Sequence, residues 1–249
     1  MSTPSTPSSC EFANGNCASL HSIEQIDALP ELVAKFGLDL PRPVLVIVGG
    51  AGNMSPETFE RLGLLFKEVI APFVDRLGAV VVDGGTDSGV MSLIGDARAA
   101  SETSFPLVGV SAIGTIECPG IDNDNSDAAT LEEHHTHFIL VPGDDWGDES
   151  KWLAATATAI AGSQTSCTIV INGGSITWKD VANSVEAGRQ TLVFDGSGRA
   201  ADELAAELRD EPADDRAAPL VASGLLQAID IEGDRDSLGE RLATLLAIP

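Results

Sequence analysis

Residues 80–91 read VVVDGGTDSGVM, a run of valines that ends in an acid and two glycines. The valines favour a buried strand, and the residues from Gly89 onward have the character of a helix. A strand that passes through a glycine turn into a helix is the building unit of α/β proteins. Such a turn can hold an anion, because glycine exposes backbone N–H groups and the following helix adds positive potential.

The same unit recurs along the 249-residue chain. Short apolar runs alternate with segments whose apolar residues recur at helical spacing. This alternation predicts an α/β fold: a doubly wound, mainly parallel sheet with helices on both faces. The strands are expected in PVLVIVGG (43–50), AVVVDGG (79–85), PLVGVSAIG (106–114), HFILVPG (137–143), CTIVINGG (167–174) and TLVFDGSG (191–198).

Length and composition predict one domain over residues 21–249, preceded by a disordered Ser/Thr/Pro-rich tail over residues 1–20. The formal charge of −24 argues against a nucleic-acid partner, which needs clustered Lys and Arg. The start of the chain lacks the basic and apolar regions of a signal peptide, and no apolar run is long enough to cross a bilayer. We therefore expect a cytoplasmic protein with no membrane partner.

Four of the expected strands end in glycine-rich turns, three of which continue with Ser or Thr. Ligands of open parallel sheets bind at the carboxyl ends of the strands, so the turns predict a nucleotide-like ligand. No turn matches GxxxxGK[ST] or GxGxxG, which argues against an ordinary ATPase or dehydrogenase. The expected ligand-binding residues are Gly49, Gly50, Gly52, Asn53, Asp83, Gly84, Gly85, Thr86, Gly89, Val90, Met91, Gly114, Gly173, Gly174, Ser175, Asp195, Gly196, Ser197, Gly198 and Arg199.

Arg199 is the cation expected to meet a phosphate, since it follows DGSG and begins a helix; the alternative is a pair with Asp195 or Asp202. Asp83 and Asp195 either accept ribose hydroxyls or bind the N–H groups of their own turns. A side chain at position 85 is expected to block the approach of a ligand to the backbone.

Trp146, in a Gly/Asp loop, is a candidate for stacking on a base, whereas Trp152 is expected in the core. The histidines of HHTHF, His134, His135 and His137, have a poor spacing for zinc, so no metal site is predicted and their role stays open. No nucleophile motif is present, and no cofactor is required beyond a nucleotide ligand.

Four stretches together resemble a known family. VVVDGGTDSGVM, PLVGVSAIG, HTHFILVPG and LVFDGSGRAADELA are similar to the SLOG (LSDAT) domain of prokaryotic TRPM type, within the LOG/DprA-like superfamily. The resemblance covers roughly residues 41–208, and the same domain occurs in the N-terminal region of TRPM ion channels. It implies a Rossmann-like fold and a nucleotide-derived ligand such as ADP-ribose or cyclic ADP-ribose. It also implies a sensor role in bacterial NAD-derived signalling or antiphage defence.

A neighbouring branch of that superfamily is enzymatic. LONELY GUY proteins hydrolyse nucleoside monophosphates with a PGGxGTxxE motif, and the matching stretch here is NGGSITWKD. Gly173, Gly174 and Thr177 match, but Asn172 stands in place of the proline, Ile176 in place of a glycine and Asp180 in place of the glutamate. The shorter carboxylate would sit about an ångström back, which favours a binding protein over a nucleotide N-glycosidic hydrolase. If the chain is an enzyme, the expected catalytic residues are Asp180 and Glu149.

The first long helix has apolar residues around most of its circumference, more than one sheet face can cover. Together with the resemblance, this predicts a homo-oligomer, most simply a dimer, whose output runs through its oligomeric state or a separate effector protein. The apolar residues concerned are Leu62, Leu64, Leu65, Phe66, Val69 and Ile70.

Overall fold

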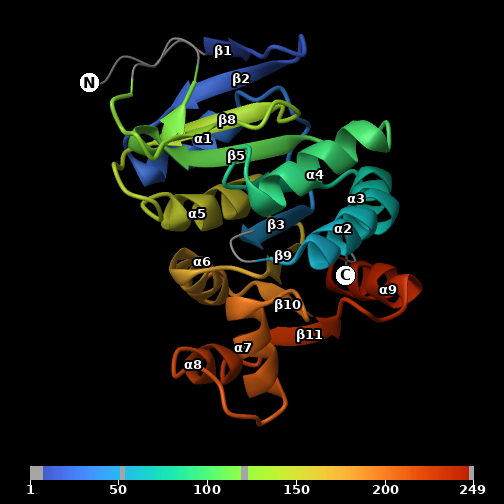
Figure 1. The fold of residues 1–249 in the computed structure, drawn as a ribbon. Coiled ribbons are helices and arrows are strands. Elements are labelled where there is room, and N and C mark those ends of the chain that lie inside the picture. Colours follow the sequence, from blue (N-terminus) through green and yellow to red (C-terminus); the bar gives the residue numbers. More distant parts are fainter. Residues whose placement is uncertain (1–7, 51–53, 119–122, 247–249) are drawn as a thin grey trace.

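The computed structural model describes residues 8–50, 54–118 and 123–246. Within these ranges nine strands form one sheet in the order β1-β2-β8-β5-β4-β3-β9-β10-β11 (Figure 1). Every neighbouring pair is parallel except β1 and β2, so the predicted α/β fold is confirmed. The strands are β1 (Ser8–Glu11), β2 (Cys17–Ser22), β3 (Val44–Gly49), β4 (Val80–Asp83), β5 (Leu107–Ala112), β8 (His137–Val141), β9 (Ser166–Ile171), β10 (Gln190–Asp195) and β11 (Leu226–Asp230), with a separate pair β6 (Ile116–Glu117) and β7 (Ala129–Thr130).

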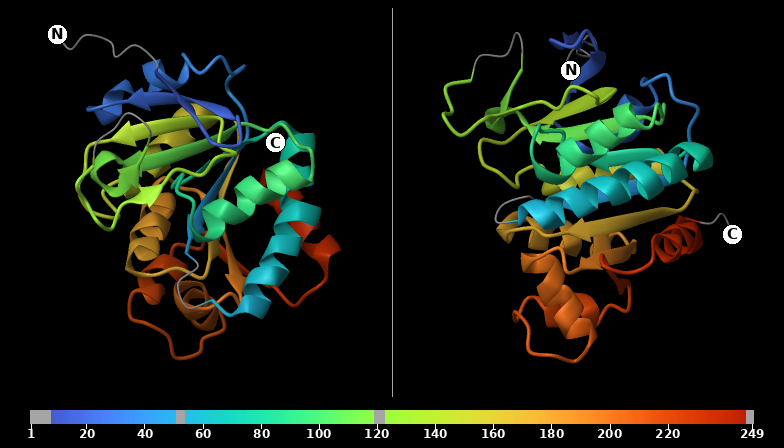
Figure 2. Two further views of the ribbon diagram at one scale, coloured as in Figure 1. Left: turned by 45° about the horizontal axis from the view of Figure 1, so that its top comes forward. Right: turned by 45° about the vertical axis from the view of Figure 1, so that its right-hand side comes forward.

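Helices cover both faces of the sheet (Figures 1 and 2). One face packs against α1 (Leu29–Val33), α5 (Ser150–Ala161), α6 (Ser175–Glu186), α7 (Arg199–Leu208) and α8 (Ala217–Val221). The other packs against α2 (Pro56–Leu65), the π-helical segment Phe66–Ile70, α3 (Ala71–Leu77), α4 (Gly89–Ala100) and α9 (Arg235–Leu246).

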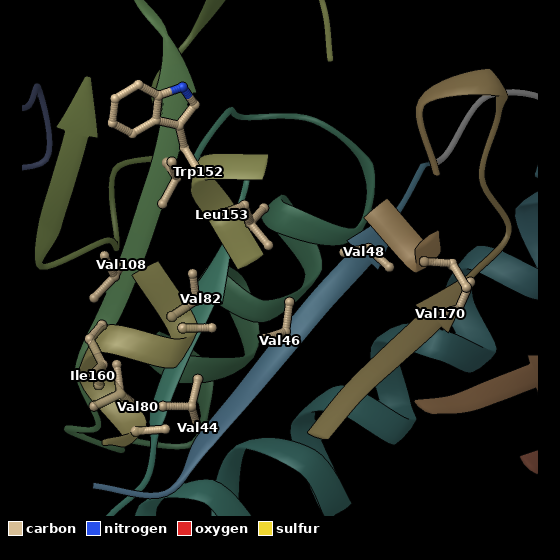
Figure 3. Packing of buried hydrophobic residues seen from close by; sticks show 14 of the residues in the cluster. Val44, Val46, Val48, Val80, Val82, Val108, Trp152, Leu153, Ile160 and Val170 are labelled. Atoms are coloured by element: carbon tan, nitrogen blue, oxygen red, sulfur yellow. The ribbon is translucent and has the colours of Figure 1, made fainter. Parts of the chain in front are cut away.

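The central strands are buried on both faces, which explains why they are continuous apolar runs. Val44, Val46 and Val48 of β3 point toward the core beneath α5, where Trp152 packs as predicted (Figure 3). The alternate residues Leu45 and Ile47 point into the opposite core. The six expected strands are therefore all present.

The order of the strands reverses beside β3. The chain moves from β3 through β4 and β5 to β8, and then returns to the other side of β3 as β9, followed by β10 and β11. The chain therefore adds strands outward from β3 in both directions. The turns that follow β3 and its neighbours separate at the carboxyl end of β3. In open α/β sheets this is where a crevice for a ligand forms.

The N-terminal segment differs from the sequence prediction, because the described part of the expected tail contains strands. β2 adds to the sheet in parallel with β8, and Ser19 pairs with His137 in the register. Ala18 and Leu20 are 1% and 6% exposed, so burial of alternate side chains stabilises this otherwise polar strand. β1 then pairs with β2 as an antiparallel edge strand.

The apolar side chains of the first long helix pack mainly against other parts of the same chain. Leu62, Leu65, Phe66 and Ile70 are at most 5% exposed, because α4 and α9 pack beside this helix as well as the sheet. Leu64 is 40% exposed. The apolar circumference is therefore no argument for a second copy, and self-association stays a prediction.

Replacement of Leu20 by Ala tests the position of β2. The loss of a buried Leu side chain should lower the free energy of unfolding by about 2–4 kcal/mol, measured by urea unfolding. The exposed Glu11 in β1 is the control, and Glu11→Ala should change the value by less than about 0.5 kcal/mol. Equal stability of the two variants would contradict the docking of this strand.

Candidate functional site

A cavity of about 330 Å³ lies at the carboxyl ends of the central strands, where their order reverses. Its volume is within the range of small-molecule sites, about 300–1,000 Å³. A larger open hollow of about 550 Å³ lies between α1, α5 and α6, but it is away from the strand ends, and four of its twelve lining residues are alanine. Of the predicted residues, the cavity brings together Gly49, Gly50, Gly84, Thr86, Met91, Gly174, Ser175 and Arg199, with Glu149 and Asp180.

The start of α6 is the part of the cavity best suited to an anion. This helix of 12 residues begins at Ser175, after Gly174 as its N-cap, and the N–H groups of a first turn have no acceptor within their helix. Arg199 lies beside this turn, since a Cβ added at Gly174 would come within 2.8 Å of its Nη2. A guanidinium and a helix N-terminus together present N–H donors and positive potential to the same point.

Arg199 is held there by an unusual backbone. It begins α7 with a φ of 52°, and Asn172 after β9 has a φ of 53°. This left-handed region is costly for residues with a side chain and recurs at functional sites. The Asn172 side chain donates to the carbonyl oxygen of Ser197 at 2.8 Å and accepts from Gly173 N–H at 2.7 Å, which ties the two turns together.

The β10–α7 turn supports Arg199 and does not itself line the cavity. The N–H groups of Gly196 and Gly198 donate to Oδ1 of Asp202 at 2.8 and 2.9 Å. Asp195 forms an ion pair with Arg209. The sequence predicted that this turn offers its N–H groups to a diphosphate. Two of those N–H groups are instead bonded to Asp202.

Two carboxyl groups line the cavity beside α5 and α6. Burial raises the pKa of Asp180 to about 7, and the charge of Glu149 adds to the effect. Burial also raises the pKa of Glu149, whose carboxylate accepts the N–H of Gly147 at 2.9 Å. At neutral pH this end of the cavity can therefore hold a proton, either for hydrogen bonding or for acid catalysis.

Asp83 lies beneath the cavity wall and is fully buried. Its Oδ1 accepts the N–H of Gly85 at 2.8 Å and faces Nε2 of His135 at 2.8 Å. The other ring nitrogen of His135 faces Glu132 at 2.7 Å, so both nitrogens donate and the ring is an imidazolium. Burial alone would lower the pKa of His135, but the two carboxylates outweigh it and raise the pKa to about 9. Asp83 thus holds its own turn, the second of the two predicted roles.

The other histidines of HHTHF also have structural contacts. Nδ1 of His134 lies 2.5 Å from Oε1 of Glu132. His137 stacks on Phe36 and contacts the Phe36 carbonyl oxygen through Nε2 at 3.2 Å. In the described ranges no group of three or more His, Cys, Asp or Glu side chains is arranged to hold a metal ion.

Gly85 has a packing role. A Cβ there would come within 2.8 Å of Cα of Gly109, at a φ of +75°. A side chain at Gly85 would therefore disturb the sheet before it met a ligand, contrary to the prediction. Besides Asp83, Gly85 and the β10–α7 turn, the predicted residues Gly89, Val90, Gly114 and Gly173 also do not line the cavity, while Gly52 and Asn53 fall outside the described residues.

Several residues of the cavity were not predicted. Ser111 of β5 is buried and donates to the carbonyl oxygen of Gly84 at 2.7 Å. A polar residue within an apolar strand is the signal that could have identified it. Trp146, which was predicted as a candidate for stacking on a base, also lines the cavity, and its indole N–H donates to Asp127 at 3.1 Å. The further lining residues are Ile47, Val48, Thr115, Leu153, Ile176 and Thr177.

The doubly wound sheet and the cavity at its switch point define a Rossmann-like α/β protein with a crevice at the carboxyl ends of its strands. The chain belongs to the family "SLOG in TRPM, prokaryote", whose model matches residues 42–238.

Known relatives with similar sequences are cation channels. The chain is 26% identical over 205 residues to transient receptor potential cation channel subfamily M member 2 of Mus musculus, with 68% of this chain and 14% of the relative covered. It is 28% identical over 215 residues to subfamily M member 6 of Homo sapiens, with 73% and 10% covered. The match therefore spans a small part of these relatives. In the described ranges of this chain, no helix has both the length and the apolar character needed to cross a membrane.

Adjacent glycines provide a test of the cavity wall. Gly85→Ala should lower the free energy of unfolding by about 2–4 kcal/mol, because the added methyl group meets the sheet at a positive φ. Gly84→Ala should change it by less than about 0.5 kcal/mol, since a Cβ at Gly84 would meet only Met91, at 3.9 Å. Thermal and urea unfolding of both variants provide the comparison, and equal losses would contradict this distinction.

The imidazolium of His135 predicts a pH dependence of stability. The folded pKa of about 9 exceeds the ordinary value of 6.5, so its contribution is complete below pH 6.5 and is lost as the pH rises through 9. The stability advantage of the wild type over His135→Asn should shrink over this window by on the order of 2 kcal/mol, measured by urea unfolding. His21→Asn is the control, because burial lowers the pKa of His21 and its effect develops only toward acid pH. A constant difference between wild type and His135→Asn would refute the imidazolium.

Proposed function

We propose that this chain is a sensor that binds a nucleotide-derived anion, such as ADP-ribose or cyclic ADP-ribose, in the cavity at the switch point. The observation that carries the proposal is the position of Arg199 over Gly174 at the N-terminus of α6. A phosphate there would accept N–H groups from the helix and a charge-assisted bond from the guanidinium. The chain has only 14 Lys and Arg against 38 Asp and Glu, so a cation in this cavity is notable.

The remaining walls suit the other parts of a nucleotide. Glu149 and Asp180 offer carboxyl groups that can bind ribose hydroxyls, and Trp146 offers an aromatic face for a base. Family membership supports the same ligand class through the resemblance described above. Bacterial NAD-derived signalling or antiphage defence is the setting we propose, and the output runs through self-association or a separate effector protein.

A second candidate function is hydrolysis of an N-glycosidic bond in a nucleotide. The observation that favours it is the pKa of Asp180, which burial raises to about 7 within the cavity. A carboxyl group with that pKa can donate a proton to a leaving base near neutral pH. The two candidate functions use the same cavity and differ in whether the bound nucleotide is hydrolysed.

Arg199→Ala should weaken binding of ADP-ribose by about tenfold or more, measured by calorimetry. This corresponds to about 1.5 kcal/mol, the lower end for a charge-assisted bond, because Arg199 is exposed to solvent. Arg209→Ala is the matched control, since it removes the same charge from the end of α7 where Arg209 pairs with Asp195. Equal affinities of Arg199→Ala and wild type would place the phosphate site elsewhere.

Incubation of wild type and Asp180→Asn with AMP, NAD and ADP-ribose separates the two functions. For a sensor, the ligand stays intact by chromatography and raises the melting temperature of wild type. It also binds the variant nearly as well, because the Asn amide can still hydrogen-bond a ribose hydroxyl. Base release by wild type that Asp180→Asn abolishes would establish the hydrolase.

A further inference from the structure

The thiols of Cys10 and Cys118 are in contact. Sγ of Cys118 lies 3.4 Å from Sγ of Cys10, although the two residues are 108 positions apart in the sequence. Cys10 belongs to β1 and Cys118 directly follows β6. We propose that Cys10 and Cys118 are a redox site that closes to an intrachain disulfide bond under oxidising conditions.

The surroundings of the pair favour a disulfide over a metal site. Cys10 and Cys118 are 2% and 6% exposed, and the other buried residues of their cluster are Ala18, Leu20, Ile116, Leu131, Phe138 and Leu140. Among the described residues, no third His, Cys, Asp or Glu side chain joins the two thiols in a group that could hold a metal ion. The sulfurs need to approach by little more than about 1 Å to reach the length of a disulfide bond, about 2.05 Å.

Access to the pair is controlled by β1. Burial raises the pKa of the Cys118 thiol to about 12, so the closed pair reacts slowly. β1 has four residues and, within the described chain, pairs in the sheet with β2 alone. Such a short edge strand opens locally at far lower cost than the whole domain, and each opening exposes Cys10 to an oxidant.

Oxidised glutathione can carry out the reaction by thiol–disulfide exchange. The Cys10 thiolate attacks one glutathione sulfur and releases the first reduced glutathione. The Cys118 thiolate then attacks Cys10 in the mixed disulfide and releases the second. Both cysteine S–H bonds are broken, one Sγ–Sγ bond forms, and the two electrons and two protons pass to glutathione.

The disulfide would fasten β1 to the segment that begins at the cavity. Thr115, which lines the cavity, precedes β6, and Cys118 lies just beyond it. The closed loop exceeds one hundred residues, so the bond removes a large chain entropy from the unfolded state. The oxidised protein should therefore melt about 10 °C above the reduced one.

The test uses the full chain with the exposed Cys17 replaced by Ser, because Cys17 and Cys10 would share the tryptic peptide 1–35. The protein is treated with oxidised glutathione under native conditions, its remaining thiols are alkylated, and it is digested with trypsin. We expect peptide 1–35 linked to peptide 99–151, a raised melting temperature, and reversal of both by dithiothreitol.

Further variants in the Cys17→Ser background test whether the linked peptide and the temperature shift come from Cys10 and Cys118. Cys10→Ser and Cys118→Ser should each lose the linked peptide and the temperature shift. Cys167→Ser, which removes a thiol buried in the separate core beneath α2, α4 and α9, should keep both. Failure of the linked peptide to form in folded protein, or a linked form that melts no higher than the reduced one, would overturn the proposal.

Discussion

The site depends on the close contact between β3 and β9 at the point where the sheet reverses. Gly49 is paired with Ile171, and a Cβ at Gly49 would overlap the Ile171 carbonyl oxygen. The next N–H, of Gly50, donates to that same carbonyl at 3.2 Å. Only a residue without a side chain lets β3 end while it is still bonded to β9. Gly49 and Gly50 both line the cavity, and neither places a side chain in it.

The sequence predicted the central strands well because they are buried on both faces. An apolar run such as that of β3 has the same composition whichever helix covers it. β2 escaped prediction because half of its residues are polar and its neighbour β8 is remote in the sequence. β11 escaped for a related reason: it is only partly buried, and its pattern is that of a surface segment. Both strands owe their structure to contacts made by the folded sheet.

The site was predicted less completely, since glycine turns indicate where a ligand can bind but not which donors remain available. Asp202 is six residues beyond Gly196, and nothing in the spacing says that it occupies the turn. Likewise Asp83 follows a strand just as a ribose-binding acid would, yet His135 arrives beside it from 52 residues away. Arg199 does line the cavity, and its position at the start of a helix after a glycine turn is the local signal that suggested it, while its contact with a phosphate stays a prediction.

The pairing of β2 with β8 has a consequence for synthesis of the chain. Ser19 of β2 can pair with His137 of β8 only after His137 has been synthesised, 118 residues later. At about 5–20 residues per second, a ribosome needs roughly 6–24 s to make that stretch. During this interval β1 and β2 can form at most an isolated hairpin, which is marginally stable in water. These two strands are therefore synthesised well before β8, the strand that secures them in the sheet.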